Sequence, residues 1–427
     1  MRILLVGALS WNPERIRSLH ERGHRLWGLW SRSMAWDQGP YPVLDSFVEE
    51  IELKDAPRVI REHQIDCVYS LFQEYYGDLL APKNRAIKQD ISSLLRALLF
   101  ERQRGAFDAP IVRHWGFDIH QFDIEVARGL DANIFCNRQK FIYFTEPKSG
   151  GGCGFDIFRA CEVTEFMDSD RPKLEFMNDN FASPLSDSNG EIHTVCIGRP
   201  FGIDYLAAAR NGIHVHIYGN NYDRVGIDET AKVSPRVHIH SSMQTVGANW
   251  TDVQRTKARW VPEFSQYDAG WSYIGDPIPW TTLENRAAIP NRLSTYVLAG
   301  IPIITDCRPG FYRYNEPHRL GVAIDFDGDY GTLRERLEAE RKSRAGAASA
   351  RHNRNGYSFD ATINPLIGVL EHARTLYFAR PHAVRSRFVT SGRPQIVFPG
   401  WHRPPRAIDR MRKWLLRGSK RVWETLS

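Results

Sequence analysis

The sequence predicts an α/β protein of two domains that face a cleft, each with a parallel sheet covered by helices on both faces. The chain has 427 residues, of which 42% are hydrophobic, so it can bury two cores of about 150 to 200 residues each. Short apolar runs alternate with helix-like segments, which is typical of doubly wound sheets. A polar, turn-rich stretch at 169–190 separates two such alternations and is the candidate linker.

The first domain is predicted to span residues 1–185. "RILLVGA" is a continuous apolar run typical of a buried strand, and "RLWGLWS" is the next one. Between them, Asn12 can cap a helix that has Pro13 at its first position, so the domain begins with a βαβ unit. Further strands are predicted in "DCVYSLF" (66–72), "PIVRHWGF" (110–117) and "ANIFCN" (132–137), with a helix in "DISSLLRALLFERQRGAF".

The second domain is predicted to span residues 191–350. Helices are expected in "DYLAAARNG" and "PNRLSTYVLAG". Six short strands are expected in "HTVCIGR", "HVHIYGN", "RVHIHSS", "YDAGWSYI", "IPIITD" and "LGVAIDF". A late helix over 356–380 follows, which can pack back on the first domain, and a tail over 381–427 ends the chain.

The positive charge of the chain is concentrated in the tail. Residues 380–427 hold 12 of the 56 Lys and Arg residues but 2 of the 50 Asp and Glu residues, so the rest of the chain is slightly acidic. This distribution argues against a body that binds nucleic acid. Residues 403–426 are predicted to form a basic amphipathic helix, which either attaches to an anionic membrane surface or packs its apolar stripe on the body or on a partner chain.

The cysteines and the first residues indicate a reducing compartment. The six cysteines are scattered without the spacing of a zinc site or a disulfide framework. The first residues lack a signal-peptide cleavage site, and no stretch approaches the ~18 apolar residues of a membrane span. We therefore expect a cytoplasmic protein, membrane-associated if the tail binds lipid.

The stretch "PNRLSTYVLAGIPIITD" (290–306) resembles a motif of GT-B-fold glycosyltransferases, especially the retaining family 4 or group 1 type. "YDAGWSYI", "CIGRPFGIDYLAAARNGIHVHIYGN" and "LGVAIDFDGDYGTLRERL" resemble the neighbouring parts of the donor domain, so the likeness covers about 192–340. It implies two Rossmann-like domains, an N-terminal one for the acceptor and a C-terminal one for the nucleotide-sugar donor.

The activity implied by this resemblance is sugar transfer of the hexosyltransferase type. The donor would be a nucleotide-sugar, and the acceptor a glycan, a lipid-linked sugar or a small molecule. Family likeness further implies retention at the anomeric carbon, no metal and no cofactor other than the nucleotide-sugar co-substrate. The absence of a GxGxxG motif after the first strand counts against a dinucleotide-binding dehydrogenase.

Physical reasoning places the donor diphosphate at the start of the helix in this motif. In open parallel sheets, ligands bind outside the carboxyl ends of the strands, where a helix amino terminus offers free N–H groups and a positive dipole end. The helix is expected to begin near Pro290 and Asn291, and Arg292 takes the place of the usual Lys of the family. The resemblance also implies that Arg199 neutralises the diphosphate, because an arginine fork suits phosphate.

Two departures from the family pattern concern the donor ribose. Thr295 stands where the family has a ribose-binding Glu, and Ala287 replaces the other Glu of the spaced pair. A hydroxyl cannot accept two bonds from a diol as a carboxylate can. The ribose is then held differently or more weakly, or the domain has lost catalysis. Asn220 and His240, at the ends of their strands, are further candidates to line the donor pocket.

The N-terminal half supplies candidates for the acceptor side. His114 lies at the end of a predicted strand, and related enzymes often have a His there that contacts the transferred sugar or the acceptor, so we assign catalytic roles to His114 and Arg199. A neutral imidazole can donate to a sugar hydroxyl or shuttle a proton. Gly7, Ser10 and Trp11, just after the first strand, are expected to face the acceptor.

Two rival functions and one metal hypothesis accompany this prediction. A nucleotide-sugar epimerase of the same architecture would act without an acceptor, and a catalytically silent subunit would bind the nucleotide-sugar only. Histidines alternate along two predicted strands, and we expect no zinc there, because period-two spacing only places each pair on one strand face. These histidines are His214, His216, His238 and His240.

Overall fold

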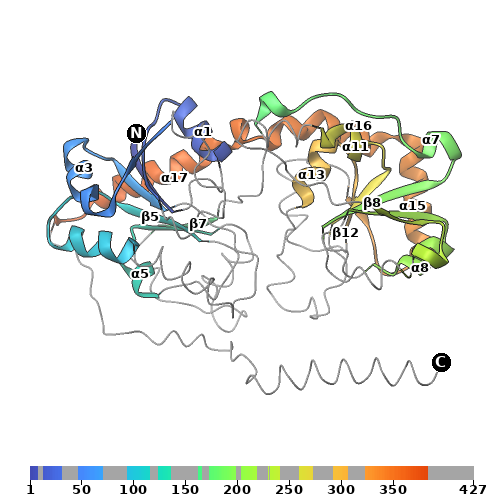
Figure 1. Cartoon of the computed structure of the whole chain (residues 1–427), viewed down its shortest axis with the longest axis horizontal. Helices are drawn as coiled ribbons and strands as arrows, with labels where there is room; N and C mark the ends of the chain where they lie inside the picture. The colour runs from blue at the N-terminus through green and yellow to red at the C-terminus, as the bar shows by residue number, and fades with distance from the viewer. Residues whose placement is uncertain are drawn as a thin grey trace, which may run out of the picture.

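The computed structural model describes residues 1–7, 13–30, 47–70, 94–115, 124–135, 162–165, 173–198, 203–218, 229, 231–240, 259–272, 292–305 and 323–382. These residues form two α/β domains that lie side by side (Figure 1), each built on one sheet. The strand pairs of both sheets are parallel. The predicted fold class is therefore confirmed.

The first sheet has seven strands in the order β3-β2-β1-β4-β5-β6-β7. Its strands are β1 (Arg2–Gly7), β2 (Arg25–Trp30), β3 (Val48–Ile51), β4 (Cys67–Ser70), β5 (Ile111–Trp115), β6 (Ala132–Phe135) and β7 (Glu162–Glu165). Strand β1 pairs with both β2 and β4, so the strand order changes direction between β1 and β4. Ligand sites of open α/β sheets form at such a switch point.

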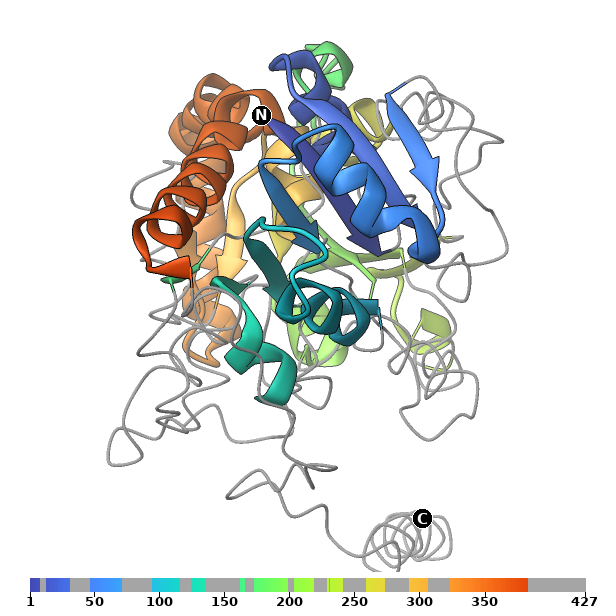
Figure 2. The same ribbon diagram turned by 90° about the vertical axis from the view of Figure 1, so that its left-hand side faces the viewer.

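One face of the first sheet is covered by helices from opposite ends of the chain. Ile3 and Leu5 of β1 pack in one buried cluster with α1 (Pro13–Glu21) and α17 (Phe359–Ala379). Figure 2 shows α17 alongside this sheet. The alternate residues of β1, such as Leu4, point to the opposite face. The other helices of this domain are α3 (Ala56–Glu62), residues 94–103 and α5 (Ile124–Gly129).

The second sheet has six strands in the order β10-β9-β8-β11-β12-β13, so its switch point lies between β8 and β11. The strands are β8 (Ile192–Ile197), β9 (Ile213–Tyr218), β10 (Val237–His240), β11 (Ala269–Trp271), β12 (Ile303–Thr305) and β13 (Ala323–Asp325). The helices are α7 (Ser186–Asn189), α8 (Tyr205–Arg210), α11 (Trp260–Ser265), α13 (Arg292–Ala299), α15 (Tyr330–Ser343) and α16 (Ala345–Asn353).

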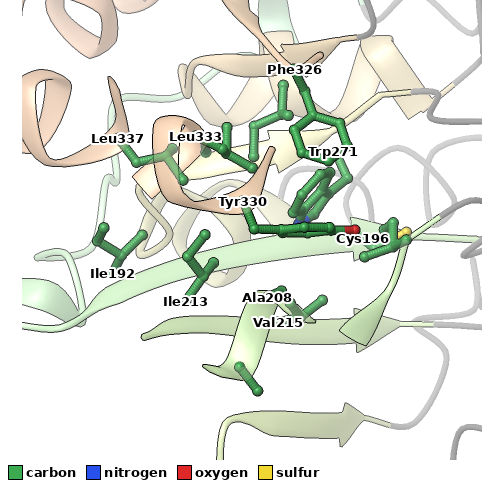
Figure 3. Packing of buried hydrophobic residues seen from close by; sticks show 14 of the residues in the cluster. Ile192, Cys196, Ala208, Ile213, Val215, Trp271, Phe326, Tyr330, Leu333 and Leu337 are labelled. Atoms are coloured by element: carbon green, nitrogen blue, oxygen red, sulfur yellow. The ribbon is translucent and has the colours of Figure 1, made fainter. Parts of the chain in front are cut away.

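Each face of the second sheet has its own buried cluster. On one face, Trp271 packs edge-on against Phe326 at 5.7 Å between ring centroids, and Tyr330 of α15 lies over the same strands (Figure 3). On the other face, α11 and α13 pack around Phe264 and Tyr296. A sheet covered on both faces explains why its strands are continuous apolar runs in the sequence.

The part of the chain that the structure describes passes between the domains twice, and the two crossings contact each other. Tyr357 is buried in the second domain and Phe359 in the first, so the return crossing takes place at Ser358, which caps α17 by accepting from the Ala361 N–H. Lys173, on the outward crossing, is buried and donates to Asp360 at 2.8 Å. The crossings therefore form one connected joint.

Further contacts strengthen this joint. Lys173 also donates to Glu21 of α1, and Arg354 donates to the carbonyl of Asn178 at 2.6 Å and to the carboxylate of Asp179. These bonds join segments that are more than 150 residues apart in the sequence.

None of the described helices is long and apolar enough to cross a bilayer. The basic tail, for which an amphipathic helix was predicted, lies outside the described residues beyond position 382.

Candidate functional site

A tyrosine hydroxyl completes the switch point of the second sheet. Strands β8 and β11 are paired at only two positions, and the Tyr296 hydroxyl lies where the pairing stops. It accepts from the Ile197 N–H at 3.2 Å and donates to the Trp271 carbonyl at 2.8 Å, with the Val195 carbonyl at 3.3 Å. Burial raises the pKa of Tyr296, so the hydroxyl keeps its proton. The side chain thereby fixes the separation of two strand ends.

The ring of Tyr296 lies directly on the backbone of β11. A Cβ atom at Gly270 would come within 2.5 Å of Cδ1 of that ring, closer than real carbon contacts allow. Any larger residue at Gly270 would displace the tyrosine. The pair therefore explains the glycine in "YDAGWSYI".

Helix α13 presents an arginine at the carboxyl end of β8. Arg292 is the first residue of α13, is half-buried, and places Nη1 at 3.2 Å from Sγ of Cys196. Burial raises the pKa of the Cys196 thiol, so the thiol stays neutral. The guanidinium charge and the amino terminus of α13 thus lie together beside the switch point.

Gly198 directly follows β8 in the left-handed region, with φ of 79°, and its N–H donates to the Tyr218 carbonyl at 2.8 Å. This geometry suits glycine. The chain then enters α8, whose first turn is capped by Asp204 accepting from the Ala207 N–H at 2.9 Å. The strand end, α8 and α13 surround one corner of the sheet.

The switch point of the first sheet carries small residues. Gly7 ends β1 with φ of 126°, and Ser70 ends β4 beside it in the register Val6 to Ser70. Ser70 is fully buried, and its Oγ finds no hydrogen-bond partner among the described residues. A buried hydroxyl with unused bonding capacity at this position is suited to a polar ligand. Ser70 was not among the predicted site residues, although it follows an apolar run as Gly7 does.

A buried polar chain lies next to this switch point. His114 of β5 is 2% exposed, and its Nδ1 is 2.9 Å from the Tyr69 hydroxyl, which accepts from Arg15 Nη1 at 3.1 Å. Because Arg15 can only donate, the economical arrangement has the Tyr69 hydroxyl donating to Nδ1 of His114. In that tautomer the ring proton of His114 is on Nε2.

Surface cavities also occur at the opposite edge of the first sheet. One is lined by Arg2, Arg61, Asp66 and Arg374, and another by His20, His24 and neighbours at the start of β2. Both lie at the amino ends of strands. They are therefore separate from the two switch points described above.

The structure is similar to solved glycosyltransferases over most of its length. An α-glucosyltransferase in complex with UDP-glucose and DNA superposes with a TM-score of 0.53 at 12% identity, over 87% of this chain and 99% of that chain. Sucrose-phosphate synthase from Thermosynechococcus elongatus has a TM-score of 0.50 at 11% identity, over 89% and 100%. HepE from Anabaena in complex with UDP has 0.50 at 11%, over 87% and 100%.

The chain has the GT-B fold. No protein-family model matches its sequence, and no curated protein matches it significantly. The similarity to the solved structures therefore concerns the fold, and membership of family 4 stays a prediction.

Of the residues predicted for the donor side of this GT-B chain, the structure brings Arg292 to the switch point. Thr295 follows one helical turn later and is buried, with 9% of its surface exposed. His240 lies at the carboxyl end of β10, stacked on Tyr218 at 4.3 Å. Arg199, Asn220, Ala287, Pro290 and Asn291 lie outside the described residues.

On the acceptor side of the GT-B fold, Gly7 is the last residue of β1. His114 is the second-last residue of β5. His114 is more deeply buried than its predicted role suggested, because Tyr69 covers its Nδ1. Ser10 and Trp11 lie outside the described residues.

Proposed function

We propose that this protein transfers a sugar from a nucleotide-sugar to an acceptor, with the donor in the second domain and the acceptor in the first. The observation that supports it most directly is Arg292, held at the switch point of the donor-type domain by α13 and Cys196. A UDP-sugar is the first donor to test, because the similar α-glucosyltransferase was solved with UDP-glucose and HepE with UDP.

The chemistry required of the second domain is stabilisation of a departing diphosphate. As the bond from the sugar to the phosphate oxygen breaks, negative charge accumulates on that oxygen. The Arg292 guanidinium and the amino terminus of α13 are positioned to stabilise it without rearrangement. We propose that Arg199 adds a second charge, and that no metal is needed because these groups supply the compensation.

The chemistry required of the first domain is positioning of the sugar and acceptor. In the arrangement derived above, Nε2 of His114 carries the proton and can donate to a sugar hydroxyl while Tyr69 and Arg15 hold the ring. Ser70 Oγ provides a further hydroxyl at the same sheet edge. We propose transfer with retention at the anomeric carbon, as the motif resemblance implies.

The burial of Thr295 bears on how the ribose is held. A Glu at this position would need its carboxylate within reach of both ribose hydroxyls, and the Thr295 side chain is shorter and 9% exposed. We propose that backbone groups or other side chains take over part of that contact. The affinity for the nucleoside is then lower than a Glu would give.

The test is titration of the full chain with UDP, UDP-glucose and a panel of other nucleotide-sugars by calorimetry, with and without a chelator. Saturable binding that persists in the chelator supports the proposal, whereas no binding by any nucleotide-sugar contradicts it. Arg292→Ala should weaken binding, and Arg210→Ala, at the exposed end of α8, is the matched control.

Product analysis separates the proposal from its rivals. Turnover of a bound nucleotide-sugar to its epimer in the absence of any acceptor would identify an epimerase. Binding without turnover across an acceptor panel would identify a silent subunit, and a gain of transfer in Thr295→Glu would strengthen that conclusion. Formation of an α-linked product from an α-linked donor would establish retention.

A further inference from the structure

Five histidines gather on one face of the second sheet, over three neighbouring strands. They are His193 on β8, His214 and His216 on β9, and His238 and His240 on β10. The parallel register places His193 beside His214 and His216 beside His238. Four of these residues stand out in the sequence by their alternation along two predicted strands. His193 was missed, because only the register of β8 on β9 brings it next to the others.

The rings are stacked and joined in pairs. His193 stacks on His214 at 4.3 Å and His216 on His238 at 4.1 Å between centroids. Nδ1 of His193 is 2.9 Å from Nε2 of His216, and Nδ1 of His214 is 2.9 Å from Nε2 of His238. One ring nitrogen of each of His193, His214 and His216 lies within 4.8 Å of the nitrogens offered by the other two.

The remaining nitrogen of each of these three rings already has an outer partner. Nε2 of His214 contacts the Glu191 carboxylate at 2.6 Å, and Nδ1 of His216 contacts Nε2 of His240 at 2.9 Å. Nε2 of His193 lies 3.3 Å from Oδ1 of Asn189 and 2.9 Å from Nδ2 of the same amide. Metal-ligating histidines are oriented by a second nitrogen that donates to a carboxylate, carbonyl or similar acceptor. Glu191 is such an acceptor for His214, and for His193 the acceptor is Oδ1 of Asn189 and not the nearer Nδ2, which is itself a donor.

Contrary to the expectation from the strand periodicity, we propose that His193, His214 and His216 form a site for a divalent transition metal of the zinc type. The ligands are Nδ1 of His193, Nδ1 of His214 and Nε2 of His216, and their outer nitrogens carry the protons. Three imidazoles suit zinc, cobalt, nickel or copper better than magnesium or calcium. His238 Nε2, beside Nδ1 of His214, is placed for the fourth position.

The distances allow this site after a small adjustment. Nitrogens bound to one zinc ion at about 2.0–2.1 Å lie about 3.4 Å apart in a tetrahedral site. The three ligand nitrogens lie within 4.8 Å of one another, and those of His193 and His216 are 2.9 Å apart, so shifts of at most about 1.4 Å in their separations give this spacing. The three rings are 5 to 7% exposed, whereas Glu191 is half-exposed at 39% of its side chain. Glu191 is therefore the solvent-exposed member of this cluster.

The site is independent of the proposed sugar transfer. His193 and His214 are each the second residue of their strand, at the amino edge of the sheet, whereas Arg292 lies at the carboxyl edge. A bound ion would cross-link β8 to β9 and stabilise the domain. It would take no part in the departure of the diphosphate.

The experiment is titration of the chelator-treated full chain with Zn²⁺ by calorimetry and with Co²⁺ by visible absorption. The proposal predicts one ion per chain, intense Co²⁺ bands of a tetrahedral nitrogen site, and a higher melting temperature with Zn²⁺. The double variant His193→Gln/His214→Gln should lose this binding. The control is His352→Gln, an exposed histidine of the same domain.

A milder variant keeps the test valid if the histidine substitutions unfold the domain. Glu191→Gln removes the charge of a half-exposed carboxylate that contacts Nε2 of His214 and also accepts from Arg236 at 2.9 Å, and it should weaken Zn²⁺ affinity about 10- to 100-fold. Glu229→Gln, an exposed carboxylate paired with Lys232, should change nothing. The proposal is overturned if the wild type binds no stoichiometric Zn²⁺ or Co²⁺, or if Glu191→Gln and the double variant bind as the wild type does.

Discussion

Replacing Tyr296 by Phe tests whether its hydroxyl holds the switch point of the second sheet together. The substitution keeps the ring over Gly270 and removes one oxygen, which accepts from the Ile197 N–H and donates to the Trp271 carbonyl. Both backbone groups lie where β8 and β11 cease to pair, so no strand neighbour replaces the lost partner. The effect is therefore confined to this junction.

The expected loss of stability follows from these two bonds. A net hydrogen bond contributes about 1 kcal/mol, and a buried group left unsatisfied costs about 1–3 kcal/mol. We expect about 2–3 kcal/mol in the free energy of unfolding of the second domain, which lowers the melting temperature by roughly 4–12 °C for a domain of this size. The amide of Ile197 should also exchange with solvent faster.

The assays are calorimetric melting and hydrogen exchange of the peptide that contains β8. Tyr377→Phe is the matched control, because it also removes one buried-ring hydroxyl, bonded to Asp108 at 2.6 Å, but in the first domain. Faster exchange of β8 in Tyr296→Phe and not in Tyr377→Phe supports the argument. An unchanged melting temperature together with unchanged protection of Ile197 would refute it.

Three further predictions concern separate parts of the molecule. Arg292→Ala should raise the dissociation constant for UDP about 10- to 100-fold by calorimetry, as expected for a charge-assisted bond of about 1.5–3 kcal/mol, whereas Arg210→Ala should leave it unchanged. Gly270→Ala should destabilise by about 1–3 kcal/mol in denaturant unfolding through overpacking, while Gly368→Ala, in open space within α17, should stabilise slightly. Burial and then the N-terminal ammonium lower the pKa of His24. As the pH falls below about 6.5, the unfolded chain therefore takes up a proton before the folded chain does, and the free energy of unfolding declines. His24→Gln should lose less of this free energy between pH 7 and pH 5, and equal slopes of stability against pH in both proteins would contradict the prediction.

Most of the fold could be predicted because buried strands leave a direct signal in the sequence. The run at 2–7 is apolar after Arg2, and the run at 213–218 is apolar on alternate positions. Both are strands in the structure. Strands β3 ("VEEI") and β7 ("EVTE") were missed, because they are short, acidic edge strands. Edge strands often carry charged residues, so they lack the hydrophobic pattern by which strands are predicted.

The candidate site was less predictable because it depends on register and on strand divergence. The motif resemblance directed attention to Thr295 and Arg292, yet the residue that closes the switch point is Tyr296. Tyr296 bridges β8 and β11 where the two strands stop pairing, and no local sequence pattern indicates where that happens. His193 was missed for the same reason, since its neighbours are more than 20 residues away in the sequence.

The double crossing between the domains has a consequence for biosynthesis. The core of the first domain includes Phe359, Ile363 and Leu370 of α17, which leave the ribosome after the whole of the second sheet. Among the described helices, α1 is the one that packs before then on the face of β1 that carries Ile3 and Leu5. The domain that is made first is therefore finished last, and a nascent chain stalled between the two sheets exposes an apolar surface of the kind that chaperones recognise.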